Sequence, residues 1–305
     1  MPELPEVETV RRTLLEGGLA GRTIRRATVA HADAVRYPSA DAFAAGLAGR
    51  EITGVGRRGK YLLIGLADGM VLVAHLRMTG RLWLSDADAE ALPHTHVVLD
   101  LDDGRQLRFR DVRRFGGFHL LADAGDSAAP QGLRELGPEP QDLTARDLAS
   151  ACRRHPKVSI KGLLLDQRAV AGLGNIYVDE ALHRARVHPL STCASLSAKA
   201  RGAVVRAVQE VLAEALANRG TTFLDFRDGT GEPGAFQEFL RVYRREGLPC
   251  RTCGAPIAKL RVAGRGTHYC PTCQKGDGSP SSTARSRTTT RSRPARTSSA
   301  SRPAR

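Results

Sequence analysis

The hydrophobic pattern of this chain changes near Pro130, and that change constrains the fold more than any other feature. Before it, short runs of β-branched and apolar residues follow one another, and Asp68-Gly69 and Asp103-Gly104 are typical of tight hairpin turns. Six runs predict strands over residues 23–29, 51–55, 61–66, 70–76, 96–101 and 106–110. An antiparallel β-sandwich or barrel is the natural way to close such a set of strands.

After Pro130 the pattern is helical. Residues 197–218 form the clearest predicted helix, because Ser197 can cap its start, apolar residues recur on one face and Gly220 follows its end. Further helices are predicted over residues 3–17, 143–153, 160–165 and 179–186. Residues 221–239, rich in Gly and Asp, predict a loop. The predicted fold class is α+β, with an N-terminal helix, an antiparallel β-sandwich and then a helical domain.

Four of the six cysteines lie in two close pairs near the end of the chain: Cys250, Cys253, Cys270 and Cys273. Two Cys-x-x-Cys pairs separated by sixteen residues are typical of a zinc ribbon. Four thiolates close a tetrahedral structural site and leave no position open for catalysis. Two unrelated pairs of free cysteines are the alternative. We predict one structural Zn²⁺ ion, which folds the hairpin between the pairs into a zinc finger.

The net charge of +14 favours a polyanionic partner, either nucleic acid or an anionic membrane surface. Residues 275–305 hold eight Lys and Arg and one Asp, so half of this charge belongs to the rest of the chain. Residues 276–305 contain almost nothing apolar and predict a disordered basic tail, which either adds nonspecific DNA affinity or only aids solubility. Without a run of eighteen apolar residues or a secretory signal, we expect a cytoplasmic protein with no membrane partner.

The chain opens with Pro2 behind the initiator methionine and Glu3 behind the proline. Removal of Met1 would expose a secondary amine, and an α-amino group has a pKa of roughly 7.7 to 8.0. A useful fraction is therefore unprotonated near neutral pH, which makes Pro2 a candidate nucleophile. An ordinary helix start is the alternative, since Pro favours the first helical position and Glu3, Glu6 and Glu8 favour the positive end of the helix dipole.

The opening sequence Pro-Glu-Leu-Pro-Glu-Val-Glu-Thr resembles that of the formamidopyrimidine-DNA glycosylases, also called 8-oxoguanine DNA glycosylases. In that family the N-terminal proline forms an imine with the sugar of a damaged nucleotide. The resemblance therefore implies that Pro2 is the nucleophile and that Glu3 transfers protons to the opening sugar ring. It also implies an active-site role for Lys60, which follows the basic turn Arg57-Arg58-Gly59. A solvated edge charge is the alternative for this lysine.

Two later segments resemble DNA-binding motifs of the same family. Residues 171–177, Ala-Gly-Leu-Gly-Asn-Ile-Tyr, match its helix-two-turn-helix segment, which implies phosphate contacts from Asn175 and from the preceding Lys161. A plain tight turn is the alternative, and a dinucleotide site is disfavoured because no βαβ unit precedes the glycines. Arg265, between two glycines of the predicted zinc hairpin, matches the finger arginine that contacts phosphates near the flipped nucleotide. A solvated turn arginine is its alternative.

Three residues match the side chains that fill the space left by an extruded nucleotide: Met78, Arg113 and Phe115. Apolar side chains inserted between base steps serve this purpose, and the family's arginine faces the orphaned base. Ordinary core positions are the alternative for Met78 and Phe115. The resemblance further implies a phosphate contact from Arg114 and a structural or phosphate-side role for His96 and its neighbour His94.

The matching motifs follow the family's order from residue 2 to about residue 274. They imply a catalytic β-sandwich domain over residues 2–129, a helix-two-turn-helix DNA-binding domain over 130–240, a zinc finger over 241–275 and the tail over 276–305. The implied activity is that of a bifunctional DNA glycosylase and abasic-site lyase in base excision repair, which removes oxidised purines and cleaves the strand by β,δ-elimination. We expect a monomer that acts on damaged double-stranded DNA and is associated with the nucleoid.

Two alternatives stay open. The sister glycosylases for oxidised pyrimidines share the fold and the proline, although Leu4 favours the purine branch because the sister group usually has Gly at this position. A catalytically silent zinc DNA-binding protein is the other, and the presence of Pro2, Glu3 and Lys60 argues against it. The loop over residues 221–239 corresponds to a segment that covers the everted base and varies within the family, so the lesion preference is also open.

Overall fold

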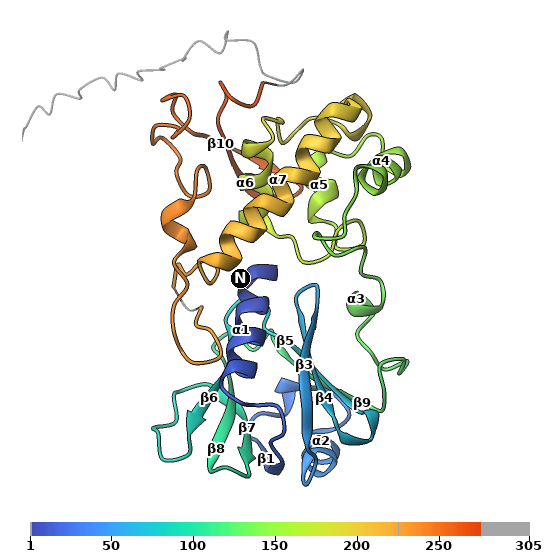
Figure 1. The fold of residues 1–305 in the computed structure, drawn as a ribbon, viewed down its shortest axis with the longest axis vertical. Coiled ribbons are helices and arrows are strands. Elements are labelled where there is room, and N and C mark those ends of the chain that lie inside the picture. The colour runs from blue at the N-terminus through green and yellow to red at the C-terminus, as the bar shows by residue number, and fades with distance from the viewer. Residues whose placement is uncertain (1, 225, 276–305) are drawn as a thin grey trace, which may run out of the picture.

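The computed structural model describes residues 2–224 and 226–275. Figure 1 shows two halves stacked along the long axis, a β-sandwich and a helical half, with helix α1 (Leu4–Glu16) running from the junction of the halves along the sandwich. The predicted α+β fold class is confirmed. The predicted disordered tail, residues 276–305, lies outside the described residues. Within the described part of the chain, no helix is long and apolar enough to cross a membrane.

The sandwich is built from two sheets. The first has the strand order β1-β7-β8-β6, formed by Ile24–Val29, Thr95–Leu101, Arg105–Asp111 and Gly80–Asp86. The second has the order β2-β9-β5-β4-β3, formed by Val35–Tyr37, Gly117–Leu121, Val71–His75, Tyr61–Leu66 and Ile52–Arg58. Helix α2 (Ala40–Leu47) packs beside β1 and β2. The predicted antiparallel sandwich is confirmed, with one parallel pair, β2 and β9, at an edge.

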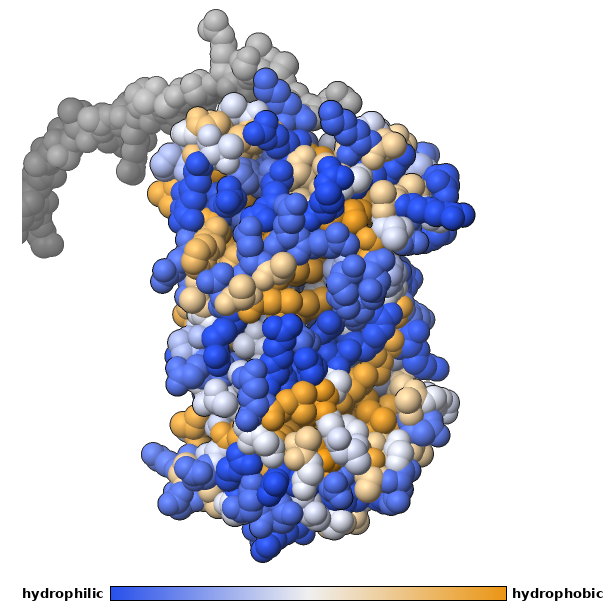
Figure 2. Space-filling model, viewed as in Figure 1, coloured by the Kyte–Doolittle hydropathy of each residue, from blue (hydrophilic) through white to orange (hydrophobic). Residues whose placement is uncertain are grey.

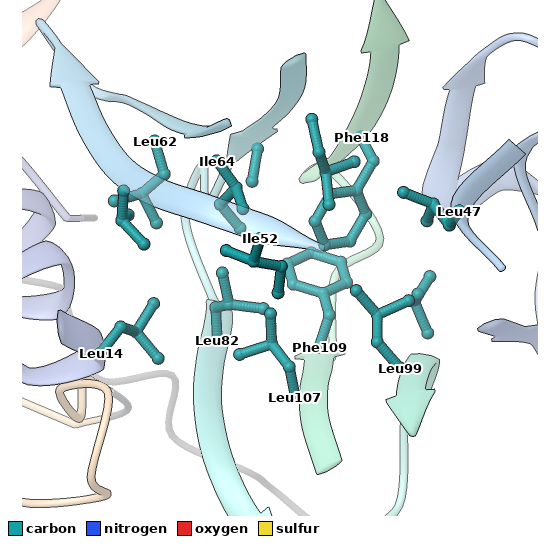
Figure 3. Close-up of a cluster of buried hydrophobic side chains, with 14 of the residues drawn as sticks. Leu14, Leu47, Ile52, Leu62, Ile64, Leu82, Leu99, Leu107, Phe109 and Phe118 are labelled. Carbon is teal, nitrogen blue, oxygen red and sulfur yellow. The ribbon is translucent and has the colours of Figure 1, made fainter. Parts of the chain in front are cut away.

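The two sheets close because alternate residues of each strand point to the same face. Phe109 of β8 and Phe118 of β9 meet between the sheets (Figure 3). Their ring centroids are 4.9 Å apart. Leu14 of α1 belongs to the same buried cluster. The core of the sandwich therefore fixes the helix that carries the N-terminal residues.

The helical half contains α4 (Ala145–Arg154), α5 (Ile160–Leu165), α6 (Asn175–Arg184) and α7 (Ala198–Ala217), and the short α3 (Gln131–Arg134) lies in the connection from the sandwich. The Ser197 side chain caps α7 by accepting a hydrogen bond from the amide of Ala200, as predicted. Helix α6 starts four residues earlier than predicted, because the Gly-rich turn leads directly into it. The hairpin of β10 (Ala258–Val262) and β11 (Arg265–Tyr269) lies between the cysteine pairs.

Candidate active site

A cleft of about 970 Å³ lies between the two halves. Seven residues predicted from the sequence line it together: Pro2, Glu3, Lys60, Met78, Arg113, Asn175 and Arg265. Figure 2 shows a mostly hydrophilic surface on one face of the molecule, with apolar side chains gathered near the junction of the halves. Residues from the start, middle and end of the chain therefore meet at one site.

Pro2 is buried at the cleft, and Glu3 immediately precedes α1. The Glu3 carboxylate accepts hydrogen bonds from the amide of Ile176 at 3.0 Å and from that of Tyr177 at 3.4 Å. Amides in the first turn of a helix, here α6, have no partner within the helix. Burial raises the pKa of Glu3 to about 7, and the nearby Lys60 ammonium opposes this shift. Glu3 can therefore hold or release a proton near neutral pH, next to Pro2.

Two glycines let the N-terminus approach α6 closely. A Cβ at Gly174 would lie 2.3 Å from Cδ of Glu3, and a Cβ at Gly172 would lie 2.8 Å from Cβ of Leu4. Gly172 also has a φ of +77°, which an L side chain rarely adopts, and its carbonyl accepts a hydrogen bond from the Leu4 amide at 3.0 Å. The Gly-Leu-Gly sequence thus lets the first residues of the chain pack directly against the turn before α6.

Lys60 is buried and donates a hydrogen bond from Nζ to the carbonyl oxygen of Leu173 at 2.8 Å. Burial lowers the pKa of Lys60, while the Glu3 carboxylate acts in the opposite direction. The preceding turn is held by Glu139, whose carboxylate accepts hydrogen bonds from both arginines of that turn, at 2.7 and 2.9 Å. Lys60 is therefore not a solvated edge charge but a fixed ammonium group within the cleft.

Glu6 connects the N-terminus to the loop that follows α7. Its buried carboxylate accepts hydrogen bonds from the Glu3 amide and the Thr221 amide, both at 2.7 Å, and from the Tyr177 hydroxyl. Burial raises the pKa of Glu6. The same loop is held again at Gly229, whose amide donates to Thr13 Oγ1 at 2.8 Å. Both attachments reach α1, so the loop bridges the two halves beside the cleft.

Three residues are predicted to fill the space of an extruded nucleotide, and we call them the wedge residues: Met78, Arg113 and Phe115. They lie on the surface of the sandwich. Met78 is 37% exposed and Phe115 is 51% exposed, which excludes ordinary core positions for them. The Arg113 guanidinium lies over the Phe115 ring, 4.6 Å from its centroid. Arg114 is exposed and adopts a φ of +56°. These side chains are free to contact a macromolecule bound across the cleft.

His96 is buried, and its Nε2 lies 2.9 Å from the backbone carbonyl oxygen of Asp111. This position contradicts a contact between His96 and DNA, because the ring is enclosed and bonded inside the sandwich. Of the two roles predicted for His96, this burial favours the structural one. The neighbouring His94 is exposed, with a φ of +68°.

Lys161 is fully buried, which contradicts its predicted direct contact with a phosphate. Its Nζ lies 2.6 Å from Oδ1 of Asp179 and 3.4 Å from the carbonyl oxygen of Gly266. Asn175 Nδ2 donates to the same Gly266 carbonyl at 2.9 Å. Gly266 follows Arg265, which is exposed at the start of β11 and lines the cleft. Lys161 and Asn175 thus hold the hairpin that presents Arg265.

The four predicted cysteine ligands come together at the end of the chain. All of their Sγ atoms lie within 4.8 Å of one another, with Cys253 to Cys270 at 3.4 Å and Cys250 to Cys273 at 4.0 Å. A tetrahedron with Zn–S bonds of about 2.3 Å has edges near 3.8 Å, so the spacing fits one zinc ion. The cluster of four thiols is a structural zinc site, and it supports the hairpin that carries Arg265.

Several cleft residues were missed by the sequence analysis, among them His75 and Tyr243. His75, at the end of β5, packs edge-on against the Tyr61 ring with centroids 4.5 Å apart, and burial lowers its pKa to about 3. Tyr243 comes from the segment between η4 (Phe236–Phe239) and the zinc site. His75 ends an apolar strand and Tyr243 lies in irregular structure, so no periodic pattern distinguishes either residue as part of a site.

Models of known families match three parts of the chain. Residues 1–118 match the formamidopyrimidine-DNA glycosylase N-terminal domain, residues 136–226 match the H2TH domain of the same glycosylases, and residues 247–276 match a zinc finger found in FPG and IleRS. These three matches cover the sandwich, the helical half and the cysteine cluster.

Curated relatives agree along most of the chain. The formamidopyrimidine-DNA glycosylase of Desulforamulus reducens is 48% identical over 277 residues, covering 90% of this chain and 99% of that protein. That of Pelotomaculum thermopropionicum is 49% identical with the same coverage.

Solved structures show the same fold. The MutM (Fpg) protein of Thermus thermophilus is 44% identical with a TM-score of 0.80, covering 90% of this chain and 98% of that one. A Lactococcus lactis FPG mutant, solved with a Fapy-dG-containing DNA, is 37% identical with a TM-score of 0.83, covering 90% of this chain and all of that one. This chain therefore belongs to the formamidopyrimidine-DNA glycosylase family.

Proposed function

We propose that this protein is a bifunctional DNA glycosylase and abasic-site lyase that removes oxidised purines from double-stranded DNA in base excision repair. The observation that carries the proposal is the position of Pro2, which lies in a cleft beside the buried carboxylate of Glu3 and the buried ammonium of Lys60. An amine next to a group that titrates near neutral pH is what imine chemistry at a sugar carbon requires.

The chemistry follows from these groups once Met1 has been removed. The Pro2 nitrogen attacks C1' of the everted nucleotide, the bond from C1' to the base breaks, and Glu3 transfers a proton as the sugar ring opens. The resulting iminium acidifies the C2' proton, and loss of that proton expels the 3' phosphate. A second elimination expels the 5' phosphate. Water then hydrolyses the imine and frees the Pro2 amine.

The other predicted site residues, within and beside the cleft, support DNA binding in this proposal. Arg265, Asn175 and Arg114 contact phosphates, and Met78, Arg113 and Phe115 occupy the space of the everted nucleotide. In this proposal the chain has three functional parts. They are a catalytic domain over residues 2–129, a DNA-binding domain over 130–240 and a zinc finger over 241–275. We expect a monomer bound to chromosomal DNA, with an affinity that falls steeply as salt rises.

Oxidised pyrimidine is the second candidate lesion class. A wild-type L. lactis Fpg has been crystallised in a complex with DNA that contains an oxidised pyrimidine. Leu4 is buried beneath Gly172 and is not among the residues that line the cleft, so it does not select the lesion by contact. Rates on the two lesions therefore have to be compared directly.

Borohydride trapping tests the proposal. Reduction of the imine fixes the protein covalently to a duplex that contains 8-oxoguanine, and mass spectrometry should place the bond on Pro2. Pro2→Gly should lose most of the crosslink, and a protein with an N-terminal tag that retains Met1 should lose all of it. The same tag at the C-terminus is the matched control. Faster trapping on oxidised pyrimidine would favour the sister activity, and binding without any crosslink would show a silent DNA-binding protein.

A further inference from the structure

The three wedge residues come from two separate connections of the sandwich. Met78 lies in residues 76–79, between β5 and β6, whereas Arg113 and Phe115 lie in residues 112–116, between β8 and β9. All three side chains are exposed to solvent, so packing alone holds them only in part. To act on one gap in a base stack, the two connections have to keep a fixed relative position.

One buried carboxylate joins the two connections. Oδ1 of Asp111 accepts a hydrogen bond from the hydroxyl of Thr79, the residue after Met78, and a second one from the Arg113 amide at 3.2 Å. Oδ2 of Asp111 accepts a hydrogen bond from the Gly116 amide at 2.7 Å, just after Phe115. The Arg113 amide also lies 3.2 Å from Thr79 Oγ1. Asp111 therefore bonds directly to Arg113 and to the residue that follows each of the other two wedge residues.

The backbone around Asp111 is itself tightly fixed. Asp111 pairs with Gly80 in the β6–β8 ladder, its amide donates to the His94 carbonyl at 3.1 Å, and its own carbonyl lies 2.9 Å from the His96 ring. A Cβ at Gly116 would lie 2.7 Å from the His75 carbonyl oxygen and 3.1 Å from Oδ2 of Asp111. Asp111 is fully buried, so it has no access to DNA and acts only through its neighbours.

We propose that Asp111 is a positioning residue that locks the Met78 and the Arg113–Phe115 connections into one rigid wedge, so that nucleotide extrusion depends on a carboxylate that never contacts the substrate. This inference rests on the proposed function. A carboxylate suits the role because all three donors point at it and it only accepts hydrogen bonds. An asparagine side chain at the same place would turn its own NH2 group toward one of these three donors.

Two variants and one control separate positioning from folding. Asp111→Asn keeps the size of the side chain but loses an acceptor, and Thr79→Val removes only the hydroxyl bond on the Met78 side. Thr79→Ser retains the hydroxyl and is the matched control. Each is assayed for excision of 8-oxoguanine opposite C and for incision of a duplex with a preformed abasic site, which has no base to extrude. Thermal melting checks that each variant is folded.

A second readout does not need catalysis. A 2-aminopurine opposite a non-cleavable abasic analogue becomes more fluorescent when the wedge unstacks it. We expect Asp111→Asn and Thr79→Val to slow 8-oxoguanine excision about 10- to 100-fold, the effect of losing one hydrogen bond to a charged group. Abasic-site incision should stay within about threefold, and the 2-aminopurine signal should rise more slowly. Thr79→Ser should behave like wild type.

Equal losses in excision and in abasic-site incision, with an unchanged 2-aminopurine signal, would overturn the proposal, because Asp111 would then only stabilise the sandwich. A wild-type protein that neither excises nor incises would instead refute the proposed function. The 2-aminopurine measurement would still decide the role of Asp111 in that case.

Discussion

Replacing Lys161 by Met should destabilise the helical half strongly, because the substitution leaves a buried charge without its partner. Lys161 and Asp179 are both fully buried, with Nζ and Oδ1 2.6 Å apart. The other oxygen, Oδ2, accepts a hydrogen bond from the amide of His268 at 2.9 Å. This pair therefore joins α5, α6 and β11 at a point where water cannot replace a lost partner.

The size of the destabilisation in Lys161→Met follows from the burial of both charges. Removing one member of a buried ion pair costs about 3–5 kcal/mol, because the remaining charge stays desolvated. A melting temperature falls by roughly 2–4 °C per kcal/mol in a protein of this size range. Lys161→Met should therefore lower the transition of the helical half by roughly 6–20 °C. Combining it with Asp179→Asn removes both charges and keeps an oxygen for the His268 amide, so the double variant should be less destabilised than Lys161→Met alone.

Calorimetry of the full zinc-loaded chain measures this cycle with four proteins: wild type, the two single variants and the double variant. Lys199→Met makes the same substitution at an exposed position near the start of α7 and should change stability by less than about 0.5 kcal/mol. The reasoning is refuted if Lys161→Met matches this control. It is also refuted if the losses in the two single variants simply add in the double variant, because the buried charges would then not be coupled.

Three further outcomes are expected. Burial would raise the pKa of Glu8, but hydrogen bonds from Arg11 and Arg12 lower this pKa to about 2. The ionised Glu8 carboxylate therefore contributes its full share to the stability of the fold above the ordinary pKa of 4.5. That contribution is lost as the pH falls through 2. The urea midpoints of wild type and Glu8→Gln should accordingly differ most above pH 4.5 and converge below it. Because burial raises the pKa of Glu3 to about 7, single-turnover base release should decline as pH rises through 7, and Glu3→Gln should lack this decline. Chelation should release one zinc per chain, measured by atomic absorption. It should weaken DNA binding in a gel-shift assay, while the circular dichroism signal of the β-sheets persists. Unchanged DNA affinity would contradict a role for the zinc finger in DNA binding.

Sequence reasoning succeeded where a local pattern has one physical explanation. The period of α7, its Ser197 cap and the two cysteine pairs predicted elements that the structure contains. Strands β2, β6 and β9 and helices α2 and α3 were missed. Glycines border β6 and β9, and β2, α2 and α3 have at most eight residues each, so none of these elements offers a clear window of periodicity.

The candidate site could be predicted only in part, because burial is a property of the tertiary structure. A lysine facing DNA and a lysine paired with a buried carboxylate have the same local sequence signal, and Asp179 lies eighteen residues beyond Lys161. For the same reason, the sequence did not separate the two roles predicted for His96, of which its burial favours the structural one. Asp111 was not singled out either, because the contact that joins the two connections is made with Thr79, which lies 32 residues away in the chain.

The bond between Glu3 and the first turn of α6 also bears on protein synthesis. The amide that completes this contact belongs to a residue translated 173 positions after Glu3. A polypeptide that ends before α6 would carry Pro2 but would lack the helical side of the cleft. We therefore expect such incomplete copies to be unable to cut DNA.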